Sequence, residues 1–329
     1  MGLKRDTLFE AFLNQHDREA WTKALQTVYP DIHEVDRAAT TIWFHFFPVD
    51  LARAFDRADD PAELARKLLI EGRHELKDHL DESHRFLYGH RYWSQVKAVV
   101  LDHVTSATAP QSLDLSTVIR TVAREAGLRA AIDESLLLGI SAVGLMTLQQ
   151  VGVEAFRATP GQVTVPRALV GASPDDVVRQ RAKDDSQGPL GFLRGIKTQY
   201  TVTFDEGDST ARFPLINAQH LTTAAAADRR DHRSRDPRCQ EGPIPVQCRT
   251  ASCGTCWVGV LGGAEKLSDV DELERRRIRE FGYVESDEAR PIIRLSCMAQ
   301  ASGNITIVIP PWNGIFGRYL RQQAVSSTA

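Results

Sequence analysis

Three of the five cysteines in this chain lie within nine residues, in the stretch CRTASCGTC at 248–256. Four residues separate Cys248 from Cys253, two separate Cys253 from Cys256, and Cys297 follows after a gap of forty residues. Four thiolates can hold a 2Fe-2S cluster, two on each iron, and the backbone N–H groups of a short loop can point at the sulfurs. The spacing therefore predicts that a compact loop and a distant segment meet around a metal cluster.

Two other uses of these cysteines fit the sequence less well. Structural zinc sites usually combine two close C-x2-C pairs, and only Cys253 and Cys256 form such a pair here. A redox dithiol of the thioredoxin kind lies at the start of a helix in a βαβ unit, whereas CGTC is followed by the strand pattern CWVGVL. The fifth cysteine, Cys239, is expected to be an incidental thiol, because four ligands complete a cluster.

Residues 1–155 predict an all-α domain. Apolar residues recur at three- and four-residue intervals, the spacing of one helix face, in LFEAFL, WTKALQTV, IWFHFF and WSQVKAVVLDHV. Ser116 and Asp133 are expected to cap two later helices that Gly127 separates. The longest apolar stretch, SLLLGISAVGLM at 135–146, is shorter than the roughly 20 residues that span a bilayer. It predicts a buried helix rather than a transmembrane segment.

The pattern changes after the helical region. Residues 156–195 are rich in Pro, Gly and charge and predict a linker, in which Ser173 before Pro174 indicates a short helix. In residues 196–312, TQYTVTF and STARFPLI predict a β-hairpin, and CWVGVL, PIIRLS and NITIVIP predict further strands. The stretches NAQHLTTAAAADRR and LSDVDELERRRIREF favour helices. We therefore expect a multidomain chain, an all-α domain and then an α+β domain, with a C-terminal tail at 313–329.

The C-terminal domain resembles the 2Fe-2S ferredoxin family, in its plant-type and adrenodoxin-like forms, over residues 196–312. CRTASCGTC matches the plant-type loop, and the long gap before RLSCMAQ is closer to the adrenodoxin-like group. The resemblance implies a β-grasp fold and a 2Fe-2S cluster as cofactor, with Cys248, Cys253, Cys256 and Cys297 as the metal ligands. The stretch RRDHRSRDPRCQEGP is an insertion relative to the compact ferredoxin pattern. No resemblance extends to the helical domain.

The resemblance also implies an electron carrier, or the electron-transfer component of an oxidoreductase system, with a reductase or oxidoreductase as its redox partner. The candidate docking segment at 265–290 opens with the carboxylates of Asp269, Asp271, Glu272 and Glu274. An acidic opening fits a basic partner, whereas the arginines that follow it fit a solvated helix with internal charge pairs. The helical domain is expected to dock a partner or to form a homo-oligomer.

The helical domain offers a second hypothesis, an enzyme that binds its own metal or substrate. Its stretch EGRHELKDHLDESHRFLYGHRYW carries four histidines, His74, His79, His84 and His90. Glu71 with His74, and Asp81 with His84, follow the spacing found in carboxylate-bridged di-iron sites. Such sites need glutamates from two further helices, which the sequence does not place, so structural histidines are the simpler interpretation. A redox sensor, in which the cluster controls a contact of the helical domain, is a third hypothesis.

Composition limits the partners and the compartment. A formal net charge of -3 gives no overall basic field, so nucleic acid is not an expected partner. The N-terminal stretch MGLKRDTLFEAFLNQHD lacks the apolar core and cleavage site of a secretory signal. The odd number of cysteines excludes a complete disulfide framework. These features together predict a cytoplasmic protein.

Overall fold

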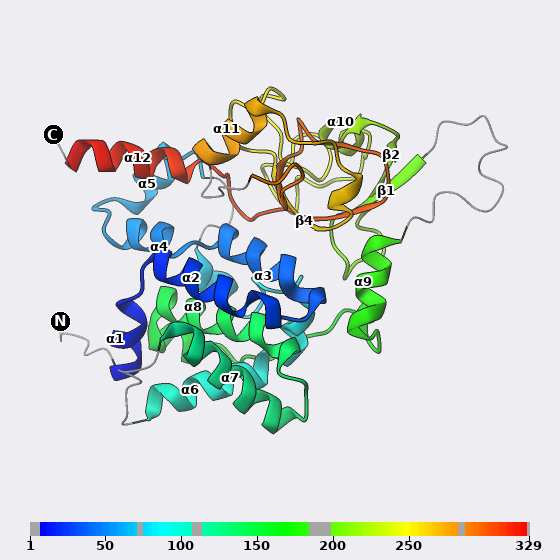
Figure 1. The fold of residues 1–329 in the computed structure, drawn as a ribbon. Coiled ribbons are helices and arrows are strands. Elements are labelled where there is room, and N and C mark those ends of the chain that lie inside the picture. The colour runs from blue at the N-terminus through cyan, green and yellow to red at the C-terminus, as the bar shows by residue number, and fades with distance from the viewer. Residues whose placement is uncertain (1–6, 71–74, 107–113, 184–198, 282–286, 328–329) are drawn as a thin grey trace. The chain divides into compact units, whose positions relative to one another are not determined.

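The chain forms two compact units, each with its own core (Figure 1). The computed structural model describes residues 7–70, 75–106, 114–183, 199–281 and 287–327. One unit contains Met1–Arg57 and Glu75–Val165 and is helical; the other contains Ala58–His74 and Pro166–Ala329 and holds a mixed sheet. The predicted fold class, an all-α region followed by an α+β region, is confirmed. No sequence pattern indicated that residues 58–74 belong with the sheet.

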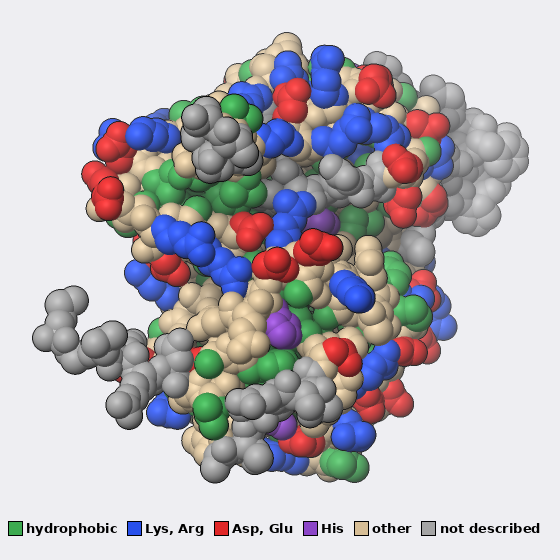
Figure 2. All heavy atoms as spheres, turned by 60° about the vertical axis from the view of Figure 1, so that its left-hand side comes forward, with side chains coloured by type: hydrophobic (Ala, Val, Ile, Leu, Met, Phe, Trp, Pro, Cys, Tyr) green, Lys and Arg blue, Asp and Glu red, His purple; other side chains and the backbone are tan. Residues whose placement is uncertain are grey.

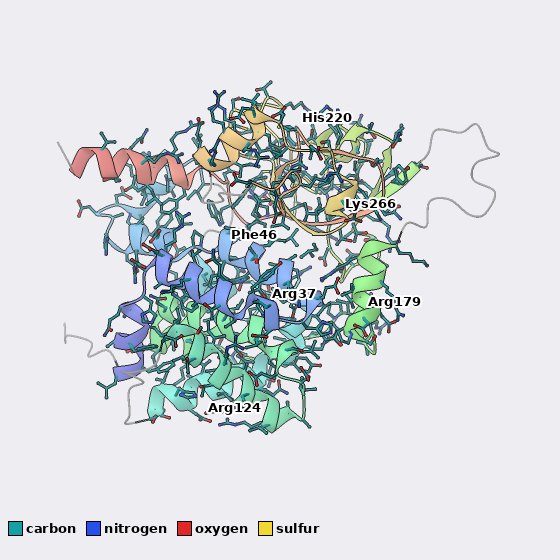
Figure 3. The ribbon with its side chains drawn as sticks, viewed as in Figure 1. Arg37, Phe46, Arg124, Arg179, His220 and Lys266 are labelled. Carbon is teal, nitrogen blue, oxygen red and sulfur yellow. The ribbon has the colours of Figure 1, made fainter. Side chains whose placement is uncertain are left out.

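The helical unit is built from the amphipathic segments that the sequence predicts. Its helices are α1 Leu8–Asn14, α2 Arg18–Val28, α3 Glu34–Phe46, α4 Val49–Asp56, α6 Trp93–Thr105, α7 Leu115–Ala130 and α8 Ser135–Ala158. Their apolar faces point inward and their charged faces outward, as Phe46 on α3 and Arg124 on α7 illustrate (Figure 3). Phe46 is buried and Arg124 is exposed, so burial of one face per helix accounts for the fold of this unit.

Helix α8 is the core of the helical unit. Residues 137–148 are all buried, and α8 packs against α1, α3, α6 and α7. A Cβ on Gly139 would lie 2.3 Å from Thr40 Oγ1, so this glycine allows α3 to approach closely. By length and composition alone α8 is able to cross a membrane, but 72% of its apolar window is buried inside the protein. The predicted buried helix is confirmed.

The helix caps differ from two of the predictions. Asp114, and not Ser116, caps α7: its Oδ1 accepts the N–H of Thr117 at 3.1 Å, and the Ser116 hydroxyl donates to the same carboxylate. Gly127 does not separate two helices but lies inside α7, which ends at Ala131 in a left-handed conformation. Asp133 lies one residue before Glu134, the N-cap of α8, and its carboxylate accepts the N–H of Ser135, the first residue of the helix. Aspartate binds N-terminal N–H groups at least as well as serine, which explains the first correction.

The second unit contains a five-stranded mixed sheet with the order β2-β1-β7-β4-β5. The strands are β1 Gln199–Thr203, β2 Arg212–Ile216, β4 Trp257–Gly262, β5 Ile293–Leu295 and β7 Ile305–Val308, with a separate pair β3 Gln219–His220 and β6 Gln300–Ala301. β1 pairs with β2 as the predicted hairpin and lies parallel to β7, while β4 runs antiparallel to β5 and β7. Every strand predicted from period-two alternation is therefore present.

The same unit also contains helices. They are α5 Pro61–Lys67, α9 Pro174–Ala182, α10 Leu221–Ala225, α11 Glu272–Phe281 and α12 Phe316–Ser327. Of these, α9, α10 and α11 contact the strands. The predicted helix after Ser173 is α9, with a capping box between Ser173 and Asp176. Arg181 fixes α9 to the turn of the β-hairpin through a two-point ion pair with Glu206. Helix α12 occupies the segment expected to be a tail; the spacing of Phe316, Tyr319 and Leu320 was the available signal for it.

Candidate metal centre

The loop at 248–256 has a backbone that surrounds a sulfur with N–H groups. Arg249, Ala251 and Gly254 adopt left-handed conformations with φ of 54°, 58° and 71°. Alternation of left- and right-handed residues turns successive N–H groups inward and forms an anion-binding concavity. Here the N–H groups of Thr250 and Ser252 donate to Cys248 Sγ at 3.4 and 3.3 Å. The prediction that loop amides point at a sulfur is confirmed.

Four thiols meet at this loop as two pairs. Cys248 interacts with Cys253, and Cys256 interacts with Cys297. The second pair forms because β4 begins directly after Cys256 and pairs with β5, which ends shortly before Cys297; the Ser296 N–H donates to Cys256 O at 2.9 Å. Within the described residues, no three His, Cys, Asp or Glu side chains gather as a single metal ion requires. Two thiol pairs suit two irons better than one ion.

The surroundings of the thiols favour thiolate at two positions. Burial raises the pKa of Cys248, but hydrogen bonds from Ser252 and Thr250 and from Cys253 outweigh it and lower the pKa to about 6. The hydrogen bond from Cys256 lowers the pKa of Cys297 and raises that of Cys256 itself. The thiolate is the form that binds metal. Each pair therefore contains one cysteine whose lowered pKa favours the metal-binding form.

The C-terminal segment 310–315 is hydrogen bonded to the cysteine loop and to the start of β4 and holds the loop in place. The Gly314 N–H donates to Gly254 O at 3.1 Å, and Trp257 Nε1 donates to Trp312 O at 2.9 Å. The two indole rings pack edge to face with their centroids 5.1 Å apart. A Cβ on Gly314 would lie 2.7 Å from the Trp257 ring, so only glycine allows this approach. No motif in the sequence indicated this support, which depends on contacts across the fold.

A buried ion pair fixes the strand that leads to Cys297. Arg294 on β5 and Glu274 on α11 are 0% and 1% exposed and form two hydrogen bonds of 2.8 Å. Glu274 Oε1 also accepts the Leu295 N–H at 2.9 Å, and Arg294 donates to Ser268 O. Glu274 therefore does not belong to an exposed acidic surface, contrary to the sequence prediction. Its carboxylate is buried because β5 supplies a guanidinium opposite α11.

The rest of the predicted acidic opening is partly engaged within the protein. Asp271 accepts the Glu274 N–H at 2.6 Å and so caps α11, and Asp269 pairs with Arg290 at 2.8 Å. Glu272 is 81% exposed and lies 3.7 Å from Arg279. Glu285, near the end of the candidate docking segment at 265–290, lies outside the described residues. Internal charge pairing is thus extensive in this segment, while Glu272 stays largely exposed.

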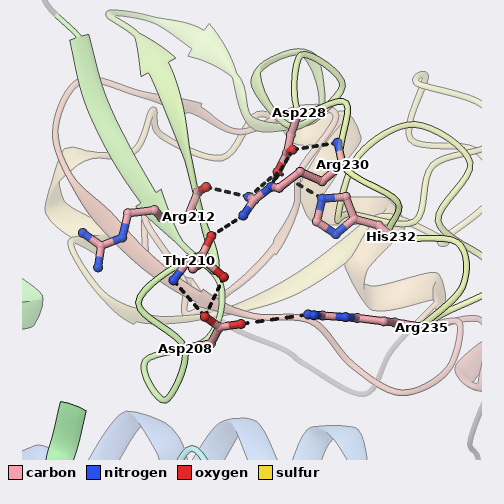
Figure 4. Close-up of polar contacts among 7 residues, drawn as sticks. All are labelled: Asp208, Thr210, Arg212, Asp228, Arg230, His232 and Arg235. Carbon is pink, nitrogen blue, oxygen red and sulfur yellow. Dashed lines mark hydrogen bonds and ion pairs between the residues drawn. The ribbon is translucent and has the colours of Figure 1, made fainter. Parts of the chain in front are cut away.

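The Arg-rich insertion before the loop is attached to the β-hairpin (Figure 4). Arg230 donates to Thr210 O and to Arg212 O, and its guanidinium pairs with Asp228. His232 Nε2 lies 3.0 Å from the same carboxylate, and the hydrogen bond from Arg230 contributes most to lowering the pKa of Asp228 to about 2. This stretch, an insertion relative to the compact ferredoxin pattern, is attached to the hairpin by its own charged side chains.

Cys239, the fifth cysteine, is buried within this insertion. Its Sγ donates to Pro243 O at 3.2 Å, and burial raises its pKa to about 12. A thiol held protonated in this way is a poor metal ligand and a poor nucleophile. The expectation that Cys239 is not a cluster ligand stays a prediction.

The histidines of the helical unit form a buried pair. His84 and His90 are 0% and 6% exposed, and their Nδ1 atoms lie 2.9 Å apart. Asp81, the expected partner of His84 in a di-iron motif, instead accepts hydrogen bonds from Trp93 Nε1 and Lys97 Nζ. Glu71 and His74 lie outside the described residues. Among the residues described, these side chains stabilise a core.

The buried histidine pair makes the helical unit sensitive to acid. Burial, and then the charge of Arg85, lower the pKa of His90 to about 4. The unfolded chain takes up this proton near pH 6.5 and the folded chain only near pH 4, so stability falls as the pH falls between these values. At pH 5 the loss relative to pH 8 is about 2 kcal/mol for this one residue.

Denaturant unfolding followed by circular dichroism at pH 8 and pH 5 measures this loss. In the His90→Gln variant, which cannot titrate at this position, the difference between the two pH values should shrink by about 2 kcal/mol. An unchanged difference would show that His90 is already charged in the folded protein.

Part of this chain matches a known protein family. Residues 227–302 match the model of the 2Fe-2S iron-sulfur cluster binding domain. No curated protein and no solved structure gives a significant match. The matched residues include the loop at 248–256, Cys297 and the buried ion pair. The C-terminal part of this chain therefore contains a ferredoxin-type domain of the 2Fe-2S iron-sulfur cluster binding family, and its cofactor is a 2Fe-2S cluster.

Proposed function

We propose that this chain is an electron-transfer protein whose 2Fe-2S cluster is held by Cys248, Cys253, Cys256 and Cys297. The observation that carries the proposal is the arrangement of these thiols in two pairs, Cys248 with Cys253 and Cys256 with Cys297. Each iron of such a cluster takes two protein sulfurs. Each pair fits one iron.

The residues around the thiols have roles that need no catalytic group. When bound, the cluster supplies a site that accepts and returns one electron. The N–H groups of Thr250 and Ser252 stabilise negative charge at Cys248 Sγ. Gly314 and Trp312 keep the loop in place through their hydrogen bonds with Gly254 and Trp257. A rigid loop reorganises little when the charge changes, which favours rapid electron transfer.

The wider organisation is consistent with a carrier that works with other proteins. The sheet order, with a hairpin whose first strand lies parallel to β7, supports a β-grasp fold. The helical unit serves as a module that docks a partner or forms an oligomer, and the protein works in the cytoplasm, where its thiols stay reduced. The redox partner is a reductase or an oxidoreductase.

Iron, sulfide and electron counting on the full chain tests the proposal. We expect two irons and two sulfides per chain and the uptake of one electron on titration with dithionite. Electron paramagnetic resonance of the reduced protein should integrate to one spin per chain. Iron clearly above two per chain would support the metalloenzyme hypothesis instead, and a cluster that takes up no electron would contradict an electron carrier.

A further inference from the structure

Helices α5 and α12 of the sheet unit border a groove of about 640 Å³. This volume lies in the range of sites that accept a ligand or a few side chains of another protein. Leu64 and Leu69 from the α5 side, and Ile315 and Tyr319 from the α12 side, form an apolar part of a lining in which polar and charged side chains predominate. Figure 2 brings the α5 and α12 side of Figure 1 forward and shows apolar side chains on the surface beside charged ones.

The groove is joined directly to the cluster loop. Ile315, one of its lining residues, follows Gly314, whose N–H donates to Gly254 O in the loop. Asn313 Nδ2 donates to Leu69 O, which joins the other side of the groove to the same segment. Rates of electron transfer between proteins fall steeply with distance. A partner that contacts Ile315 would therefore touch the residue next to Gly314, which is hydrogen bonded to the cluster loop.

Leu69 is held at the surface in an unfavourable conformation. Its side chain is 54% exposed, and its φ of 51° lies in the left-handed region that bulky residues rarely adopt. The Leu69 N–H donates to Arg66 O, and its carbonyl accepts from Asn313, so the backbone is fixed in this state. An exposed apolar side chain on a fixed backbone loses little conformational freedom when a partner covers it, which favours binding there.

The lining of the groove contains three carboxylates and two cations, and this small excess of negative charge favours a basic partner. Both cations in its lining face carboxylates: Lys67 lies 3.0 Å from Glu63 and Arg318 lies 3.6 Å from Glu280. Asp59 and Asp60, both exposed, add negative charge to the lining. Complementary charge increases the rate of encounter between proteins, and the apolar contact then limits dissociation.

We propose that the α5/α12 groove is the docking site for a redox partner protein whose contact surface presents an apolar side chain flanked by lysine or arginine. The inference rests on the proposed function and names the surface that it uses. The groove competes for this role with the exposed face of α11 around Glu272, part of the candidate docking segment at 265–290. Single charge reversals distinguish the two surfaces.

The experiment uses the full chain and cytochrome c, a basic haem protein, as the probe. The chain is first reduced, excess reductant is removed, and stopped-flow absorbance follows the transfer of one electron from the cluster to ferric cytochrome c. We expect Asp59→Lys to slow this transfer by about threefold or more at low ionic strength, with the difference fading at high salt. Leu69→Asn should slow it at both salt concentrations, because asparagine accepts the left-handed backbone and only the apolar contact is lost.

Glu19→Lys is the matched control. It changes the net charge by the same amount at an exposed position of α2 in the helical unit, and it should leave the rate unchanged. The inference is overturned if Asp59→Lys slows transfer no more than Glu19→Lys does, or if Glu272→Lys slows it and Asp59→Lys does not. Cluster absorbance and electron uptake are recorded for each variant beforehand. A wild-type cluster that takes up no electron would overturn the proposed function itself, which separates the two failures.

Discussion

Replacing Cys256 by serine is expected to remove most of the visible absorbance of the cluster and to lower the iron content below two per chain. Cys256 is 2% exposed and hydrogen bonded to Cys297, so water cannot readily take its place. A serine hydroxyl is a poorer ligand for iron than a thiolate, because soft sulfur donors are the ones that hold iron-sulfur clusters. Absorbance spectra, with iron and sulfide analysis of the purified full chain, measure the effect.

Cys239→Ser is the matched control for this result. The Cys239 thiol donates to Pro243 O, an interaction that a serine hydroxyl can also make. We therefore expect the variant to keep the wild-type spectrum and two irons per chain. Loss of the cluster in Cys239→Ser, or an intact spectrum in Cys256→Ser, would contradict the proposed ligand set.

Removing one partner of the buried pair between Glu274 and Arg294 should be the most destabilising single change away from the cysteines. Glu274→Ala leaves a guanidinium that is 0% exposed without its carboxylate. Breaking a buried ion pair in this way costs about 3–5 kcal/mol. The Leu295 N–H also loses its acceptor, so β5 is weakened shortly before Cys297. Urea unfolding followed by circular dichroism and cluster absorbance gives the change in stability.

Two further variants make this measurement specific. Glu272→Ala, on the same helix but 81% exposed, should change stability by no more than about 0.5 kcal/mol. The double variant Glu274→Leu with Arg294→Met removes both charges and should be less destabilised than either single change, since no unpaired charge remains buried. Equal losses for Glu272→Ala and Glu274→Ala would show that the pair has no special role.

Patterns that repeat locally could be predicted from the sequence. The cysteine spacing indicated the cluster, since ligands on one loop are visible as a motif, and the alternation in TQYTVTF and STARFPLI indicated the hairpin. The helices of the N-terminal region could be predicted in the same way, because the apolar face of each helix gives apolar residues at intervals of three and four.

Features that depend on a distant partner could not be predicted in the same way. Glu274 looks like its exposed neighbours until Arg294, twenty residues later, is placed opposite it. Asn313 has no local signal for its bond to Leu69. Asp114 caps α7 in place of Ser116. Both residue types are good N-caps, and the small preference between them could not be predicted from the sequence. Contacts of this kind are properties of the folded chain.

The hydrogen bonds of segment 310–315 decide how this protein can be divided. A fragment cut at residue 312, where the strand pattern ends, would keep all four cysteines of the proposed ligand set but lose the Gly314 N–H that holds Gly254. A fragment that begins at residue 166 would keep the sheet but lose the Leu69 carbonyl to which Asn313 is attached. The iron-binding unit is therefore not a continuous segment at the end of the chain. A truncated or fused protein that contains only this end would lack residues from the first quarter of the sequence that belong to the fold of this unit.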